Sequence, residues 1–173
     1  MTATASSVFT AAQFNTHVRD NLLETAVAKA TGASHYFVST GVNTLAERDL
    51  NIDEVSASET TTSTSYVDLA TTGPTQAATT GGRAIVVVSA LISNSTAGAN
   101  AYMSWAVSGA STIAASDTWA LQHRDAGTTG ALQASRFYLA EGLTSGSNTF
   151  TGKYKVSSGT GTFVARQIVV MGF

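Results

Sequence analysis

The stretch TFTGKYKV at residues 149–156 decides the fold class, because apolar and polar side chains alternate along it. Phe150, Tyr154 and Val156 share one face of an extended chain, and the other face carries only threonine and lysine side chains. A period of two is typical of a strand with one buried and one solvated face. The stretch therefore predicts antiparallel β-structure.

Outward from this stretch, residues 66–173 contain short β segments separated by clusters of glycine, serine and asparagine. This pattern predicts an all-β fold, an eight-stranded antiparallel jelly-roll sandwich. The expected strands are residues 66–71, 76–79, 83–93, 101–107, 119–123, 132–140, 149–156 and 162–171.

Two of the expected strands, 83–93 and 162–171, are apolar on both faces. A sandwich strand has one inward face, so the second apolar face must be covered by the N-terminal arm or by another subunit. The candidates for a trimer interface or for the core are Ile85, Val87, Ile168 and Val170. The expected core residues are Ile85, Val87, Trp105, Phe150, Tyr154 and Val169.

An N-terminal arm, residues 1–50, precedes the sandwich and contains one expected amphipathic helix at 11–30. Thr10 is a good N-cap residue, and Gln13 stands at the capping-box position. An apolar stripe follows at helical spacing, with polar side chains on the other side of the helix. This candidate docking stripe consists of Phe9, Phe14, Val18 and Leu22.

Residues 51–65 are rich in serine and threonine, and we expect an extended, solvated linker there. The expected organisation is therefore a docking arm at 1–50, a linker at 51–65 and a jelly-roll domain at 66–173.

The composition argues against several classes of partner. The 173 residues carry 9 basic and 11 acidic side chains, a net charge of −2, and charged residues make up only 12% of the chain. This balance predicts no nucleic-acid partner and no membrane partner, because both depend on basic or long apolar segments. The chain has no cysteine, which excludes disulfides, thiolate metal sites and a cysteine nucleophile.

No residue pattern indicates catalysis, and we expect neither a catalytic residue nor a metal or other cofactor. His17, His35 and His123 have no paired ligand spacing, and no Gly-x-Ser-x-Gly elbow surrounds any serine. Trp105 and Trp119 with Tyr102 could form a sugar-binding platform, but core packing is the favoured interpretation.

Several motifs in order along the chain carry a family resemblance. Residues 65–173 resemble the C-terminal jelly-roll domain of virion structural proteins from tailed bacteriophages, particularly those of actinobacteria. The front of the chain is similar to an N-terminal segment of phage head and tail accessory proteins. The motifs are FNTHVRDNL at 14–22, TGVNTL at 40–45, YVDL at 66–69 before Gly73-Pro74, TGGRAIV at 80–86, AVSGA at 106–110, LTSGSNTF at 143–150 before Tyr154, and GTF at 161–163 before Arg166 and Ile168.

The resemblance implies a non-enzymatic virion component that forms a homotrimer in the manner of tumour-necrosis-factor-like domains. It implies a capsid decoration or minor capsid protein, with the major capsid protein or another virion protein as its partner. The apolar stripe predicts that the arm docks on that partner; the alternative is that the helix packs back onto its own trimer. The alternative that the resemblance leaves open is a minor tail or tail-fibre protein that recognises a host surface glycan.

Overall fold

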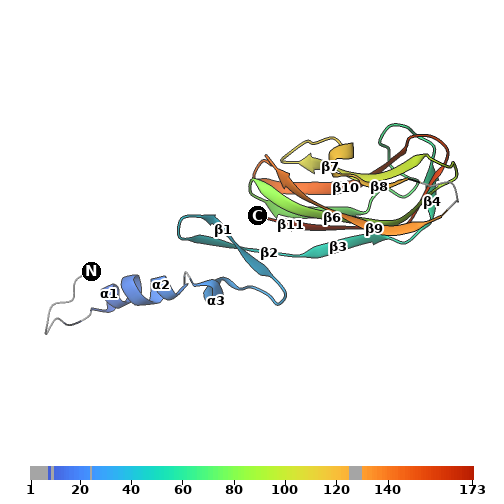
Figure 1. The fold of residues 1–173 in the computed structure, drawn as a ribbon. Helices are drawn as coiled ribbons and strands as arrows, with labels where there is room; N and C mark the ends of the chain where they lie inside the picture. Colours follow the sequence, from blue (N-terminus) through green and yellow to red (C-terminus); the bar gives the residue numbers. More distant parts are fainter. Residues whose placement is uncertain (1–7, 9, 24, 125–129) are drawn as a thin grey trace. The chain divides into compact units, whose positions relative to one another are not determined.

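The computed structural model of the chain describes residues 8, 10–23, 25–124 and 130–173 (Figure 1). The chain divides into two compact units, Met1–Glu47 and Arg48–Phe173, which are described separately below. Phe9, one of the four residues expected in the docking stripe, lies outside the described residues.

The first unit begins with the expected helix start. Thr10 accepts a hydrogen bond from the backbone N–H of Gln13, and the Gln13 side chain accepts one from the backbone N–H of Thr10. This reciprocal capping box fixes the first helical residue at Ala11, as the sequence predicts.

The expected continuous helix at 11–30 is wrong in its second half. The helix runs through α1 (Ala11–Phe14), a π-helical turn (Asn15–Arg19) and α2 (Asp20–Leu23), and a separate turn, α3 (Ala26–Lys29), follows. The Thr25 hydroxyl donates to the carbonyl of Leu22 and accepts from the N–H of Ala28. Because this side chain bonds the end of one helix and the start of the next, it favours a break.

A small hairpin completes the first unit. Strands β1 (Tyr36–Gly41) and β2 (Thr44–Arg48) form a two-stranded sheet. Asn43 at its tip has φ of 58°, a left-handed conformation that asparagine tolerates. The carboxylate of Glu47 accepts bonds from the backbone and hydroxyl of Thr31 and lies 2.8 Å from Nδ1 of His35, which ties the segment after α3 to the hairpin.

The second unit is an all-β sandwich of two antiparallel sheets, which Figure 1 shows as two layers. One sheet has the order β5-β10-β7-β8, and the other has the order β3-β11-β6-β9, with β4 also paired to β11. From β5 onward most consecutive strands change sheet, as in a jelly roll. The strands are β3 (Asn51–Val55), β4 (Glu59–Thr61), β5 (Thr75–Thr80), β6 (Arg83–Asn94), β7 (Asn100–Gly109), β8 (Leu121–Arg124), β9 (Leu132–Glu141), β10 (Gly146–Val156) and β11 (Gly161–Gly172).

Two of the expected boundaries are corrected. The stretch 51–65 is not a free linker, because β3 and β4 within it both hydrogen-bond to β11. The expected strand at 66–71 is not formed; only Val67 makes an isolated bridge, to Tyr154 of β10. The β unit therefore starts near Arg48 rather than at residue 66.

The core between the sheets confirms part of the expected set. Trp105, Phe150 and Tyr154 are buried, and Trp105 stacks on Trp119 with ring centroids 5.0 Å apart. Ile168 and Val170 are also core residues. The sugar platform is not formed by the tryptophans, because Trp105 lies in the core and is only 2% exposed.

In strand β6 the side chains that face the core are the alternate set to the one expected from the sequence. Its buried side chains include Ala84, Val86 and Val88, whereas Ile85 and Val87 point away from the core and are half-buried. Since both phases of this strand are apolar, a period of two could not decide between them.

The strand β11 is apolar at both phases partly because it contains a bulge. Its register against β6 shifts between Val164 and Gln167, and Ala165 has φ of 47°. The extra residue reverses the alternation, so Phe163 and Arg166 both face the core. After the bulge Val169 faces outward, which corrects its expected place in the core.

Candidate functional site

The outer side of the sheet β3-β11-β6-β9 carries a broad group of apolar side chains, here named the apolar face. Residues paired across an antiparallel ladder point to the same side of the sheet. The apolar face consists of Ile52 on β3, Val169 and Met171 on β11, Ile85 and Val87 on β6, and Phe137 and Leu139 on β9.

Four of these residues form one row across the sheet. Val169 pairs with Ile52 on one side and with Val87 on the other, and Val87 pairs with Phe137. The row therefore runs along the hydrogen-bonding direction through all four strands. A second row, Met171–Ile85–Leu139, lies beside it.

Exposure along the row is greatest at its two ends. Ile52 is 58% exposed and Phe137 is 59% exposed, whereas Val87 and Val169 between them are half-buried. Large apolar side chains that together leave an exposed patch mark an interaction surface more often than scattered ones do. The apolar face is thus the main candidate for a protein contact in the β unit.

A polar row borders the apolar face. Gln167 donates to a carboxylate oxygen of Glu54 at 2.9 Å and accepts from the hydroxyl of Ser89 at 3.1 Å, and Ser89 pairs with Ser135. These groups bond to one another across three strands. This polar row separates Val87 and Val169 from Leu91 and Val164, the next apolar pair along β6 and β11.

The outer side of the other sheet has a different character. Its exposed or half-buried positions carry mostly small polar side chains, such as Thr75, Thr149 and Thr151, together with lysines. Lys153 bonds Asp68 with Nζ 2.7 Å from the carboxylate. This contrast distinguishes the two outer surfaces of the sandwich.

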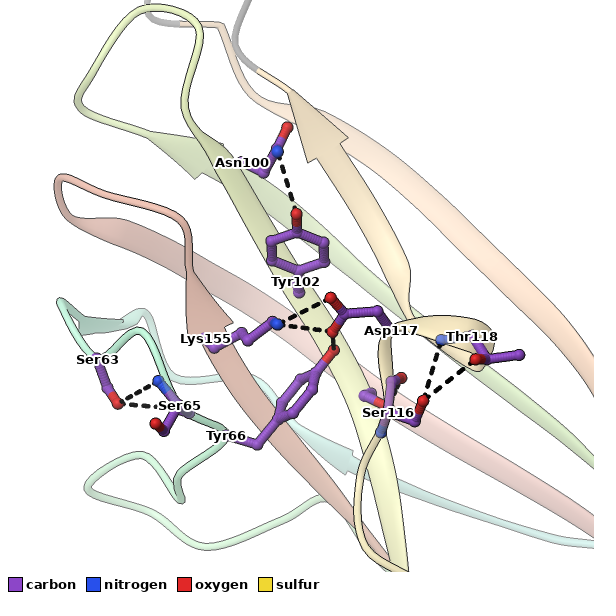
Figure 2. Close-up of polar contacts among 10 residues, drawn as sticks. Ser63, Ser65, Tyr66, Asn100, Tyr102, Ser116, Asp117, Thr118 and Lys155 are labelled. Atoms are coloured by element: carbon purple, nitrogen blue, oxygen red, sulfur yellow. Dashed lines mark hydrogen bonds and ion pairs between the residues drawn. The ribbon is translucent and has the colours of Figure 1, made fainter.

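A cluster of tyrosines and charges is the second candidate site, and Figure 2 shows it on the β7–β10 side. Nζ of Lys155 lies 2.7 Å from Oδ1 of Asp117, and the hydroxyl of Tyr66 donates to the same oxygen at 2.8 Å. The ammonium also lies 4.9 Å from the ring centroid of Tyr66 and 4.8 Å from that of Tyr102. The hydroxyl of Tyr102 accepts from the side chain of Asn100.

The electrostatics of this cluster favour a fixed, unreactive network. Burial, and then its hydrogen bond to Asp117, raise the pKa of the Tyr66 hydroxyl well above its usual value. The hydrogen bond from Lys155 lowers the pKa of Asp117. With the phenol neutral and the carboxylate and ammonium paired, the cluster ties the segment at Tyr66 and the turn at Asp117 to the sheet.

The docking stripe of the first unit is exposed where the structure describes it. Phe14 and Leu22 are exposed and Val18 is half-buried. Leu23, the neighbour of Leu22, is also exposed. These side chains leave an apolar surface along residues 14–23 that the described residues of the first unit do not bury.

The histidines do not assemble into a site. His35 pairs with Glu47 in the first unit, and the ring of His123 is 3.2 Å from the carbonyl of Gly130 in the β unit. In the described part of the chain, no three His, Cys, Asp or Glu side chains group where they could hold a metal ion. No helix among the same residues is long and apolar enough to cross a membrane.

Sequence reasoning missed the ends of the apolar face. Ile52 lies in the stretch expected to be a linker, and Phe137 and Leu139 are not among the expected core or interface residues. Residues 137–140 read FYLA, which is apolar at both phases, and this signal could have identified β9 by the criterion applied to β6.

Comparisons with known proteins give little further information. No protein-family model and no curated protein matches the chain. A solved structure of infectious bursal disease virus, Gx strain, is similar over 78% of this chain with 8% sequence identity and a TM-score of 0.42. The similar region spans 36% of that virus chain, about a third of its length.

Proposed function

We propose that this chain is a non-enzymatic structural protein of a bacteriophage virion, a homotrimeric capsid decoration or minor capsid protein. The observation that carries the structural part of this proposal is the apolar face, because a surface of this kind on a sandwich serves protein–protein contact. The phage assignment rests on the ordered motifs in the sequence.

The proposal gives the two units separate tasks. The β unit forms the trimer and projects as a knob, while the stripe Phe14, Val18 and Leu22 docks on the major capsid protein or another virion protein. Each large side chain that becomes fully buried would contribute about 1.5–3 kcal/mol. Three copies of the stripe add by avidity, since the second and third attachments are intramolecular.

The test is binding to virions that lack the protein. Phe14→Asp with Leu22→Asp should abolish binding while the trimer stays folded, because the two charges prevent burial of the stripe. The matched control is Ala12→Asp with Thr16→Asp, which places two charges at exposed positions off the stripe. Equal binding by both double variants would refute docking through the stripe.

Cryo-electron microscopy of intact virions tests the location. Density on the capsid with threefold symmetry supports decoration. Density at the tail tip would instead favour the receptor-binding alternative, and binding to isolated host surface glycans would then be measured. Absence of the protein from purified virions would refute the whole proposal.

A further inference from the structure

The exposure of the side chains on the apolar face indicates how identical copies of this chain contact one another. The most exposed apolar side chains are at the two edges of the sheet, Ile52 on β3 and Phe137 on β9. The two edges are different surfaces of one chain. Contact between different surfaces of identical copies is heterologous, and it closes into a ring when the rotation allows it.

The row geometry favours such a ring. Ile52, Val169, Val87 and Phe137 lie at one level along the strands, in the direction of the ladder hydrogen bonds. A rotation axis parallel to the strands preserves that level. It therefore brings Phe137 of one copy to the height of Ile52 in the next.

The width of the sheet favours three copies. Four strands about 4.8 Å apart give a face roughly 19 Å wide, and three such faces in a triangle leave an inscribed radius of about 5.5 Å. This radius matches half the roughly 10 Å that separates packed sheets. Four faces would leave a radius of about 9.5 Å, which these side chains cannot fill at that spacing.

We propose that Phe137 and Leu139 of each copy pack against Ile52 of the next copy in a head-to-tail ring of three, with Val87 and Val169 turned toward the threefold axis. This inference rests on the proposed homotrimer. It adds which surface forms the interface and which residues of neighbouring copies contact each other. The occupant of the apolar face is thus a second copy of this chain.

The arm is the competing occupant of the apolar face. Its helical stripe holds Phe14, Val18 and Leu22. A single helix is about 10 Å across, so one laid along the strands would contact mainly the two central strands, which are about 4.8 Å apart. Ile52 and Phe137 at the edges would stay exposed beneath it. A neighbouring sandwich at each edge covers both residues, which is why a second copy fits better than the arm.

The absence of cysteine from the sequence permits a direct test with the full chain. Ile52→Cys with Phe137→Cys should form a covalent trimer on oxidation, seen on a non-reducing denaturing gel. Within one copy the two positions are three strand spacings apart, about 14 Å, too far for an internal disulfide. Ala77→Cys with Gln122→Cys, exposed on the edge strands of the other sheet, is the matched control and should not form this product.

Each outcome of the cross-linking decides the question. Covalent dimers from either single cysteine variant would indicate a twofold contact and overturn the ring. The protein could also be a trimer in solution that gives no cross-link. If the charged variants Ile52→Lys and Phe137→Glu, described next, then keep the trimer mass, the interface lies elsewhere and the proposed function is not affected. A wild-type monomer at tens of micromolar would instead refute the homotrimer itself.

Variants that introduce opposite charges at the two positions give a second, independent measurement. Ile52→Lys alone and Phe137→Glu alone should lower the mass in light scattering from that of a trimer of 17.7 kDa chains. The double variant should restore the trimer, because each new lysine then faces a new glutamate. Circular dichroism and thermal unfolding show whether each variant is folded, and a folded double variant that stays monomeric overturns the pairing.

Discussion

Arg166 and Glu59 form an ion pair inside the sandwich, with Nη2 of the guanidinium 2.8 Å from Oε2 of the carboxylate. The side chain of Arg166 is fully buried and that of Glu59 is 13% exposed. Glu59 also accepts from the backbone N–H and the hydroxyl of Thr71, and the guanidinium lies over the ring of Tyr154. The pair therefore joins β4, the segment that follows it and β11.

Replacing Glu59 by glutamine should destabilise the β unit. The change leaves the Arg166 guanidinium buried without its counter-charge, and removal of one partner from a buried pair costs roughly 3–5 kcal/mol. Chemical unfolding of the two proteins measures the difference. Glu141→Gln, which breaks the well-exposed pair with Arg83, is the control and should cost less than about 1 kcal/mol. Similar losses in both variants would contradict the role of burial.

The contribution of Glu59 should depend on pH. Hydrogen bonds from Thr71, with the charge of Arg166 in addition, lower the pKa of Glu59 below its ordinary 4.5. Its ionised form therefore stabilises the folded state above pH 4.5, and this stability is lost as pH falls from there through the lowered pKa. The difference in unfolding free energy between wild type and Glu59→Gln should shrink between pH 7 and pH 3. A constant difference over that range would contradict the prediction.

The pair Lys155–Asp117 should contribute little to stability. The Asp117 side chain is 58% exposed, so solvent screens the attraction. A double-mutant cycle with Lys155→Met and Asp117→Asn should give a coupling energy of about 0.5–1 kcal/mol. A coupling several times larger would mean that the cluster carries more than the attachment of Tyr66 and the turn at Asp117.

Replacing all three histidines, His17, His35 and His123, by glutamine should leave virion binding intact. Glutamine can still donate to Glu47 from position 35, and the other two side chains make no ion pair that the structure shows. Sedimentation with virions measures binding. The same preparation is assayed for hydrolysis of host cell-wall glycans, and a large loss of such an activity in the variant would overturn the non-enzymatic proposal.

Local sequence patterns determined the β class, most strand positions and the start of the helix. The strand at 149–156 was predictable because alternation separates Phe150 and Tyr154 from Lys153 and Lys155, and the structure confirms it. The helix start was predictable because Thr10 and Gln13 are only three residues apart and bond to each other directly. Both signals arise within one element.

Only the tertiary structure decided which apolar side of β6 faces the core, that residues 51–61 join the sandwich, and how Arg166 is paired. Strands β3 and β4 form because β11, one hundred or more residues later, supplies their hydrogen-bond partners. Glu59 and Arg166 are 107 positions apart. The bulge at Ala165 reverses the phase of β11, and no local period reports it. These features depend on pairing between distant segments, which a pattern read along the chain does not contain.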